Sequence, residues 1–143
     1  MKRNFWLCLL AYLLPTFPIG YFWHLAWFAD RYEQLALYRH DVIIPLGFAS
    51  MLIQALIFAW AYPRLFSVSR EEWRASALRC FATLGLLSWS FTTLPVAAKF
   101  RMASVADFIL LETGFTAFQF AIVAPLMALA YRKKVSANPS LPT

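Results

Sequence analysis

Charged residues are scarce in this chain: they make up 14% of its 143 residues, against about a quarter in an ordinary soluble domain. Hydrophobic residues make up 62%. Water is therefore not the main solvent of this protein. The net charge of +6 does not indicate nucleic-acid binding, because the basic residues lie at the ends of apolar runs rather than on one polar segment.

Catalytic motifs are lacking as well. Cys8 and Cys80 are the only cysteines and form no CxxC motif, so we expect two small apolar side chains in helix packing and no thiol-disulfide enzyme. There is no GxSxG motif for a serine hydrolase, and His40 next to Asp41 lacks the spacing of a metal site. We expect no metal and no enzymatic activity, and the sequence identifies no cofactor.

Four apolar segments are long enough to cross a bilayer, whose core about 30 Å thick needs roughly 20 helical residues. Only helices and closed barrels satisfy every backbone group in lipid. We predict an all-α integral membrane four-helix bundle with up-down topology over residues 1–134, and a flexible tail over residues 135–143. The predicted spans are residues 5–28, 42–62, 75–98 and 108–131.

The first segment begins like a signal peptide but lacks a small-residue cleavage site before Asp30, so we expect it to be retained as a span. The positions of Lys and Arg predict the orientation of the spans. Nine lie at the two chain ends and in the middle loop: Lys2, Arg3, Arg64, Arg70, Arg74, Arg79, Arg132, Lys133 and Lys134. The other two loops carry four: Arg31, Arg39, Lys99 and Arg101. Both termini are therefore predicted to be cytoplasmic, in the inner membrane.

The segments between the spans carry weaker signals. Residues 29–41 are predicted to face outside, where Tyr32, Leu35 and Tyr38 at helical spacing indicate a short helix on the membrane surface. Two helix starts are also predicted, from a serine followed three residues later by an acidic residue. These pairs are Ser69 with Glu72 and Ser104 with Asp107.

Polar side chains recur within the spans at spacings of three or four, which places them on one face of each helix. From the helical rise of about 1.5 Å per residue, we expect Glu112, His24 and Thr92 in one layer below the outer surface. Gln54 and Gln119 are expected in a second layer near the midplane. The predicted polar site comprises His24, Gln54, Thr92, Glu112, Thr116 and Gln119.

Glu112 is the most informative of these residues, because an ionisable group in hydrocarbon costs about 3 kcal/mol or more and needs a partner. His24 is the nearest in height, with Arg101 and Lys99 as rival partners. The functional interpretation is a proton-handling or ligand-binding pair. The structural interpretation is a hydrogen bond that fixes helix register.

Small and polar residues also predict packing faces in lipid. In the second span such a face contains Gly47, Ser50 and Gln54. In the fourth span a stripe of small residues lies roughly opposite the Glu112 face, and we expect it to contact another subunit or a second copy. The stripe comprises Gly114, Ala117, Ala121, Ala124 and Ala128.

Three stretches together resemble small bacterial membrane proteins that are classed as domains of unknown function. They are residues 17–24 (FPIGYFWH), 44–54 (IPLGFASMLIQ) and 111–120 (LETGFTAFQF). The resemblance implies a four-span fold over most of the chain. It implies no activity, so no functional residue is assigned through it.

The leading functional hypothesis is therefore a non-enzymatic accessory or assembly subunit that packs against a larger membrane complex or against itself. The alternative is a small membrane enzyme or binder of a lipophilic ligand that uses the intramembrane Glu/His pair. A transporter is less well supported, since the spans show no paired broken helices in two repeated halves. The expected partners are the lipid bilayer and either a membrane protein or a second copy of this chain. If the alternative function holds, a lipophilic small molecule is also expected. Nucleic acid is not expected as a partner.

Overall fold

The computed structural model describes residues 2–37, 39 and 41–132. This part of the chain is almost entirely helical and contains no strand. Nine elements follow one another: α1 (Lys2–Phe22), the π-helical turn η1 (Trp23–Trp27), α2 (Ala29–Gln34), α3 (Ile44–Leu65), α4 (Trp73–Cys80), the π-helical turn η2 (Phe81–Gly85), α5 (Leu86–Thr92), α6 (Leu94–Lys99) and α7 (Val105–Tyr131).

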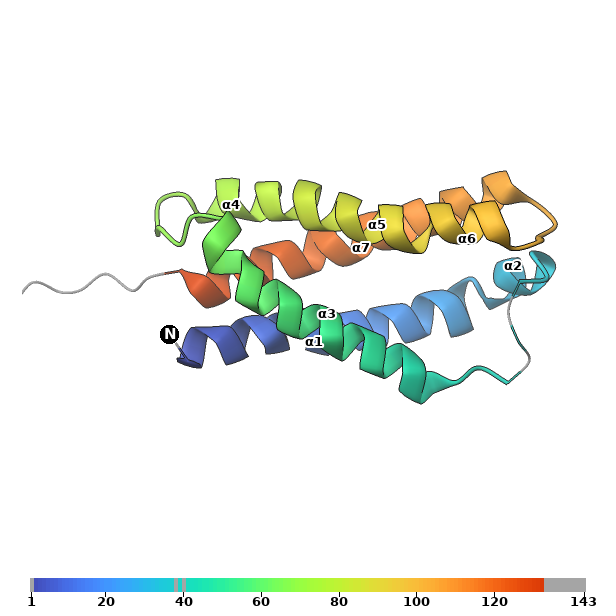
Figure 1. The fold of residues 1–143 in the computed structure, drawn as a ribbon, viewed down its shortest axis with the longest axis horizontal. Helices are drawn as coiled ribbons and strands as arrows, with labels where there is room; N and C mark the ends of the chain where they lie inside the picture. The colour runs from blue at the N-terminus through green and yellow to red at the C-terminus, as the bar shows by residue number, and fades with distance from the viewer. Residues whose placement is uncertain (1, 38, 40, 133–143) are drawn as a thin grey trace, which may run out of the picture.

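These elements form a bundle of four long helical segments that alternate in direction (Figure 1). The segments are α1 with η1, then α3, then α4 through α6, then α7. The N-terminus, the α3–α4 connection and the end of α7 lie at one end, which we call the terminal end. The short helix α2, the start of α3 and the α6–α7 connection lie at the other, the α2 end. The predicted all-α four-helix bundle is confirmed.

All four segments are long and apolar enough to cross a membrane. They are Arg3–Trp27, Ile44–Leu65, Trp73–Lys99 and Val105–Tyr131. Every predicted boundary lies within about three residues of the observed one, which is the usual error of boundaries read from sequence. Many large apolar side chains on their surfaces are exposed, as expected where lipid rather than water surrounds the bundle.

The main core lies in the half of the bundle nearest the terminal end. Tyr12 of α1 and Phe120 of α7 are 1% and 0% exposed there. α3 joins this core through Ala55, Phe58, Ala59 and Tyr62, but residues 41–50 before them are all exposed. In Figure 1, α3 crosses the bundle obliquely, and its start lies away from the other helices. Gly47 and Ser50 therefore do not form the predicted packing face, and of that set only Gln54 makes a hydrogen bond within the bundle.

Proline explains one of the breaks in the helices. Pro95 has no N–H to bond to the carbonyl of Phe91, and the third segment is interrupted nearby at Thr93 before it continues as α6. Pro125, in contrast, lies inside the uninterrupted α7. The turns η1 and η2 are π-helical, a form that frequently occurs at functional sites.

The short helix predicted within residues 29–41 is present as α2, but its apolar side chains are buried in the bundle. Tyr32 of α2 and the following Leu35 are 0% and 3% exposed. They pack against Phe108 and Leu111 of α7. A backbone hydrogen bond of 3.1 Å from Ala103 N–H to the Leu35 carbonyl ties this segment to the α6–α7 connection. Tyr38, the third residue of the pattern, lies outside the described residues.

One of the two predicted helix starts is confirmed. The Ser104 side chain accepts a 3.2 Å hydrogen bond from the Asp107 N–H and caps α7. Ser69 does not cap α4, which begins at Trp73. Its hydroxyl bonds instead to Glu71 at 2.6 Å, and this hydrogen bond lowers the pKa of Glu71. The capping box of Ser69 with Glu72 was therefore wrong, because a local turn competes for the hydroxyl.

Candidate functional site

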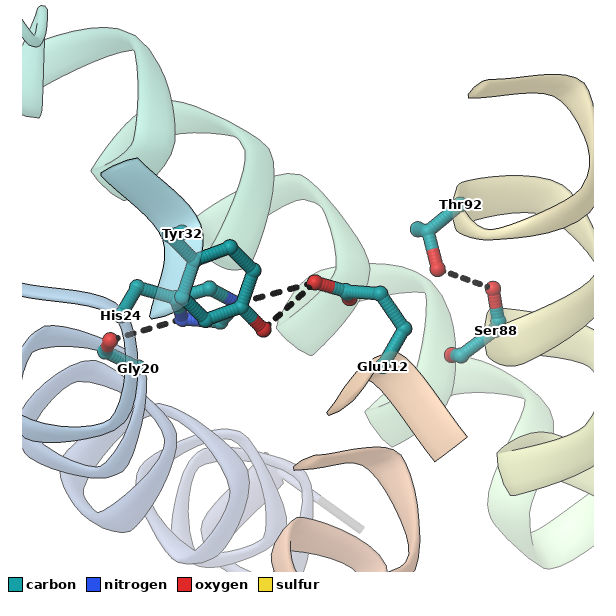
Figure 2. Close-up of polar contacts among 6 residues, drawn as sticks. All are labelled: Gly20, His24, Tyr32, Ser88, Thr92 and Glu112. Atoms are coloured by element: carbon teal, nitrogen blue, oxygen red, sulfur yellow. Dashed lines mark hydrogen bonds and ion pairs between the residues drawn. The ribbon is translucent and has the colours of Figure 1, made fainter. Parts of the chain in front are cut away.

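Glu112 of α7 lies at the centre of a polar cluster near the α2 end of the bundle. Its Oε1 atom accepts a 2.8 Å hydrogen bond from the Tyr32 hydroxyl. The same oxygen lies 3.4 Å from Nε2 of His24, so the two predicted residues do meet (Figure 2). Glu112 is only 8% exposed. The two contacts compensate the carboxyl group for the water that it loses on burial.

His24 is held in place from several sides. It belongs to η1, and its Nδ1 atom lies 2.9 Å from the Gly20 carbonyl oxygen one turn earlier. Its ring packs edge-on against Phe115, with centroids 4.4 Å apart, and lies 4.9 Å from the ring of Tyr32. The imidazole is therefore fixed between α1, α2 and α7 before any ligand arrives.

This geometry fixes how the imidazole ring faces Glu112. The Gly20 carbonyl can only accept a hydrogen bond, which assigns the hydrogen of the neutral ring to Nδ1. Nε2 then faces the carboxyl group of Glu112.

A second polar layer lies deeper in the bundle, as the positions of Gln54 and Gln119 predict. The Tyr12 hydroxyl donates a 2.6 Å hydrogen bond to Oε1 of Gln54. Nε2 of Gln119 donates to the Tyr12 hydroxyl at 3.3 Å and to the Thr16 hydroxyl at 3.1 Å. This network joins α1, α3 and α7, and its buried groups satisfy one another, which is the expected role of polar residues between helices in lipid.

The remaining predicted residues lie apart from both layers. Thr92 is exposed, and its hydroxyl donates a 2.9 Å hydrogen bond to the Ser88 carbonyl of its own helix rather than to Glu112 (Figure 2). Thr116 is 8% exposed and lines a groove between α5, η2 and α7. Lys99 and Arg101, the rival partners of Glu112, are exposed and form no ion pair with any residue that the structure describes.

The site includes three residues that the sequence did not predict: Tyr12, Thr16 and Tyr32. Tyr12 and Thr16 precede Gly20 and His24 at intervals of four, so all four lie on one face of α1. Extending the predicted Gly20–His24 face by two turns toward the N-terminus would have found them. Tyr32 had no such signal, because its contact with Glu112 depends on α2 folding back over the bundle.

An open cleft adjoins the polar cluster. It has a volume of about 260 Å³, lies between the second half of α1 and the start of α3, and is mostly apolar. His24 is part of its wall. A second, more polar hollow of about 390 Å³ continues past His24 toward α2, with Glu33 and Arg39 in its wall. The His24–Glu112 pair thus stands beside a space that is large enough for a small molecule.

The predicted interface stripe of α7 is divided by the fold. Ala124 and Ala128 are buried in the core of the monomer, at 0% and 3% exposure. Gly114 lies under the Trp23 ring, which a Cβ atom at that position would meet at 3.3 Å. Only Ala117 and Ala121 are exposed. A contact with another subunit stays a prediction, and these two residues are the part of the stripe that could form it.

Metal ligands do not gather in the part of the chain that the structure describes, where no three His, Cys, Asp or Glu side chains form a group. His40, considered with Asp41, lies outside the described residues.

Comparison with protein-family models, with curated proteins and with solved structures found no match to this chain. The resemblance to small bacterial membrane proteins therefore stays a prediction, and the function must be argued from the site itself.

Proposed function

We propose that this chain is an integral protein of the cytoplasmic membrane that binds a lipophilic molecule in the cleft between α1 and α3. One observation carries the proposal: His24, which contacts the buried Glu112, also lines the open cleft. A pair that served packing alone would gain nothing from adjoining an open space. A largely apolar hollow with a few fixed polar groups is the usual form of a small-molecule site.

Within this proposal, Glu112 and Tyr32 keep the His24 ring at the boundary between the apolar cleft and the polar hollow. Binding is the minimal function of such a site, and it requires no cofactor.

The decisive experiment is native mass spectrometry of the full chain, isolated in nanodiscs that retain its membrane lipids. We expect one lipophilic molecule per chain on the wild-type protein. The variant Glu112→Gln should lower its occupancy by about tenfold, the effect of losing about 1.4 kcal/mol of binding. As a matched control, Asp107→Asn alters a carboxylate that pairs with Arg31 at 3.6 Å on the surface, and occupancy should be unchanged. Equal occupancy in both variants, or no retained molecule, would refute the proposal.

The proposed orientation places both termini in the cytoplasm. It is supported by the excess of Lys and Arg at the terminal end, where the N-terminus and the α3–α4 connection lie (Figure 1). In a background with Cys8 and Cys80 changed to Ser, Arg70→Cys should resist a membrane-impermeant maleimide in intact cells. Arg39→Cys should react with it, and the opposite pattern would invert the topology.

A second function, that of an accessory subunit or self-assembling protein, is favoured by a different surface. Exposed Ala117 borders the groove of about 310 Å³ between α5, η2 and α7, which also contains Ala82 and Gly85. Small residues there would let another helix approach closely. In the same mass spectrum, Ala117→Leu should abolish any dimer or stoichiometric complex. A monomer at every concentration would count against this role.

A further inference from the structure

The cleft between α1 and α3 and the hollow beside it share part of their walls but differ in chemistry. His24, Leu25 and Val42 line both spaces. The cleft is otherwise lined by apolar groups, among them Phe17, Phe48 and Met51. The hollow is more polar, because Glu33 and Arg39 bring opposite charges to its wall.

We propose that the ligand is a single-chain amphiphile with a zwitterionic head, whose acyl chain lies in the cleft and whose head lies in the hollow. This inference rests on the proposed binding function and specifies its ligand class. His24, which lines both spaces, then lies where the acyl chain of the ligand meets its head group.

The size of the cleft favours one chain. At about 260 Å³, it lies near the lower end of the range of about 300–1,000 Å³ that is usual for small-molecule pockets. A space of this size favours a slender single chain over a broader ligand. Residues 41–50, which lead into α3 and form its first turns, are all exposed. This side of the cleft is therefore open to an acyl chain that enters from the bilayer.

The charges of the hollow favour a zwitterionic head. Arg39 can pair with a phosphate through hydrogen bonds, and Glu33 can attract a positively charged ammonium group. Arg39 also donates two hydrogen bonds to Asp41, at 3.1 and 2.9 Å, which lower the pKa of Asp41 and keep it charged. This pair is exposed, and exposed pairs are weak, so the guanidinium can turn toward a phosphate. With two carboxylates beside one guanidinium, a purely anionic head would be repelled.

Gly47 offers a way to fill the cleft without damaging the fold. A Cβ atom at this position would meet nothing within 4 Å, although the residue lines the cleft. Ala49, two positions later, is exposed but does not line it. Gly47→Leu therefore blocks the cleft, and Ala49→Leu is the matched control on the same helix.

The test uses a lysophosphatidylcholine with a photoreactive diazirine in its chain, added to the full protein in dioleoylphosphatidylcholine vesicles. Crosslinked residues are mapped by mass spectrometry. We expect crosslinks at Phe17, Phe48 and Met51, reduced about tenfold by Gly47→Leu and unchanged by Ala49→Leu. Excess unlabelled lysophosphatidylcholine should compete with the probe and reduce the crosslinks on the wild-type protein.

A second probe tests the head group. Palmitic acid with the same diazirine should label the cleft about tenfold less than the lysophosphatidylcholine probe does. The double variant Glu33→Gln, Arg39→Gln should remove this preference for the zwitterionic probe.

Crosslinks spread evenly over the exposed faces of the helices, or insensitive to Gly47→Leu, would overturn the inference. Equal labelling by palmitic acid would overturn the zwitterionic head. These failures are distinct from failure of the proposed function. If native mass spectrometry still finds a bound molecule that depends on Glu112, the protein binds a ligand of another class, whereas loss of both signals removes both proposals.

Discussion

The two halves of α3 face the same neighbour, α1, with opposite results. In the half nearest the terminal end, Ala55 and Ala59 are fully buried and the aromatic rings of Tyr12 and Phe58 meet edge-on, with centroids 5.2 Å apart. In the other half, Gly47 is just as small, yet nothing approaches it. A small residue permits close packing in lipid, but it does not cause it. Both halves contact α1 through an aromatic edge, which in the open half joins Phe17 and Phe48 with centroids 5.6 Å apart. Only the closed half adds fully buried small residues, whereas the open half leaves a cleft.

The largest expected effect tests whether the closed half carries the stability of the bundle. Phe120→Ala removes a ring that is 0% exposed and packs against Tyr12 and Phe58. It should lower the free energy of unfolding by about 3 kcal/mol. Phe48→Ala, the same change in the open half, removes a ring that is 40% exposed and should cost less than about 1 kcal/mol. Unfolding by SDS in mixed micelles measures both. Similar losses would mean that the two halves do not differ in packing strength.

The next effect concerns the deeper polar layer. Tyr12→Phe deletes the hydroxyl that donates to Gln54 and accepts from Gln119, leaving both amides with fewer partners. We expect a loss of about 2 kcal/mol in the same unfolding assay. Tyr21→Phe is the matched control, because Tyr21 is 45% exposed, and it should change stability by less than about 0.5 kcal/mol. A loss as small as that of the control would show that the layer is not structural.

A smaller effect is expected at the α2 end, where Tyr32 links α2 to Glu112. Tyr32→Phe keeps the buried ring but removes the 2.8 Å hydrogen bond, which should cost about 1 kcal/mol. Because α2 is short, we expect the loss to appear locally, as about fivefold faster hydrogen exchange in Ala29–Gln34 with α7 unchanged. Faster exchange in all helices would instead make Tyr32 part of the main core.

The smallest expected effect is a gain of stability in the same region. Ala36 has a φ angle of 53°, in the left-handed region that non-glycine residues seldom adopt. Ala36→Gly should relieve this strain and raise the free energy of unfolding by about 0.5 kcal/mol. The change at Ala121, an exposed position in the interior of α7, provides the contrast, because Ala121→Gly should destabilise its helix by about 1 kcal/mol. A loss at Ala36 would mean that the turn after α2 is not strained.

Much of this fold could be predicted from the sequence, because membrane spans are marked by length, hydropathy and the absence of charge. The heights of the polar residues could also be predicted, since the helical rise is fixed. That is why Glu112 was matched with His24 and Gln54 with Gln119. Thr92 was predicted at a suitable height but does not bond to Glu112, because its hydroxyl donates to the Ser88 carbonyl of its own helix. Height follows from sequence, whereas direction depends on how the helices pack.

By itself, the sequence determined the four apolar helices, the cap of α7 at Ser104 and the two polar layers. Only the tertiary structure decided that α2 folds inward, so that Tyr32 reaches Glu112 across 80 positions of the chain. It also decided that an open cleft lies between the second half of α1 and the start of α3, beside His24. The physical reason is that helix formation and depth in lipid are local properties of a segment. Contacts between distant segments depend on the shapes of all the packed side chains together, which periodicity does not encode.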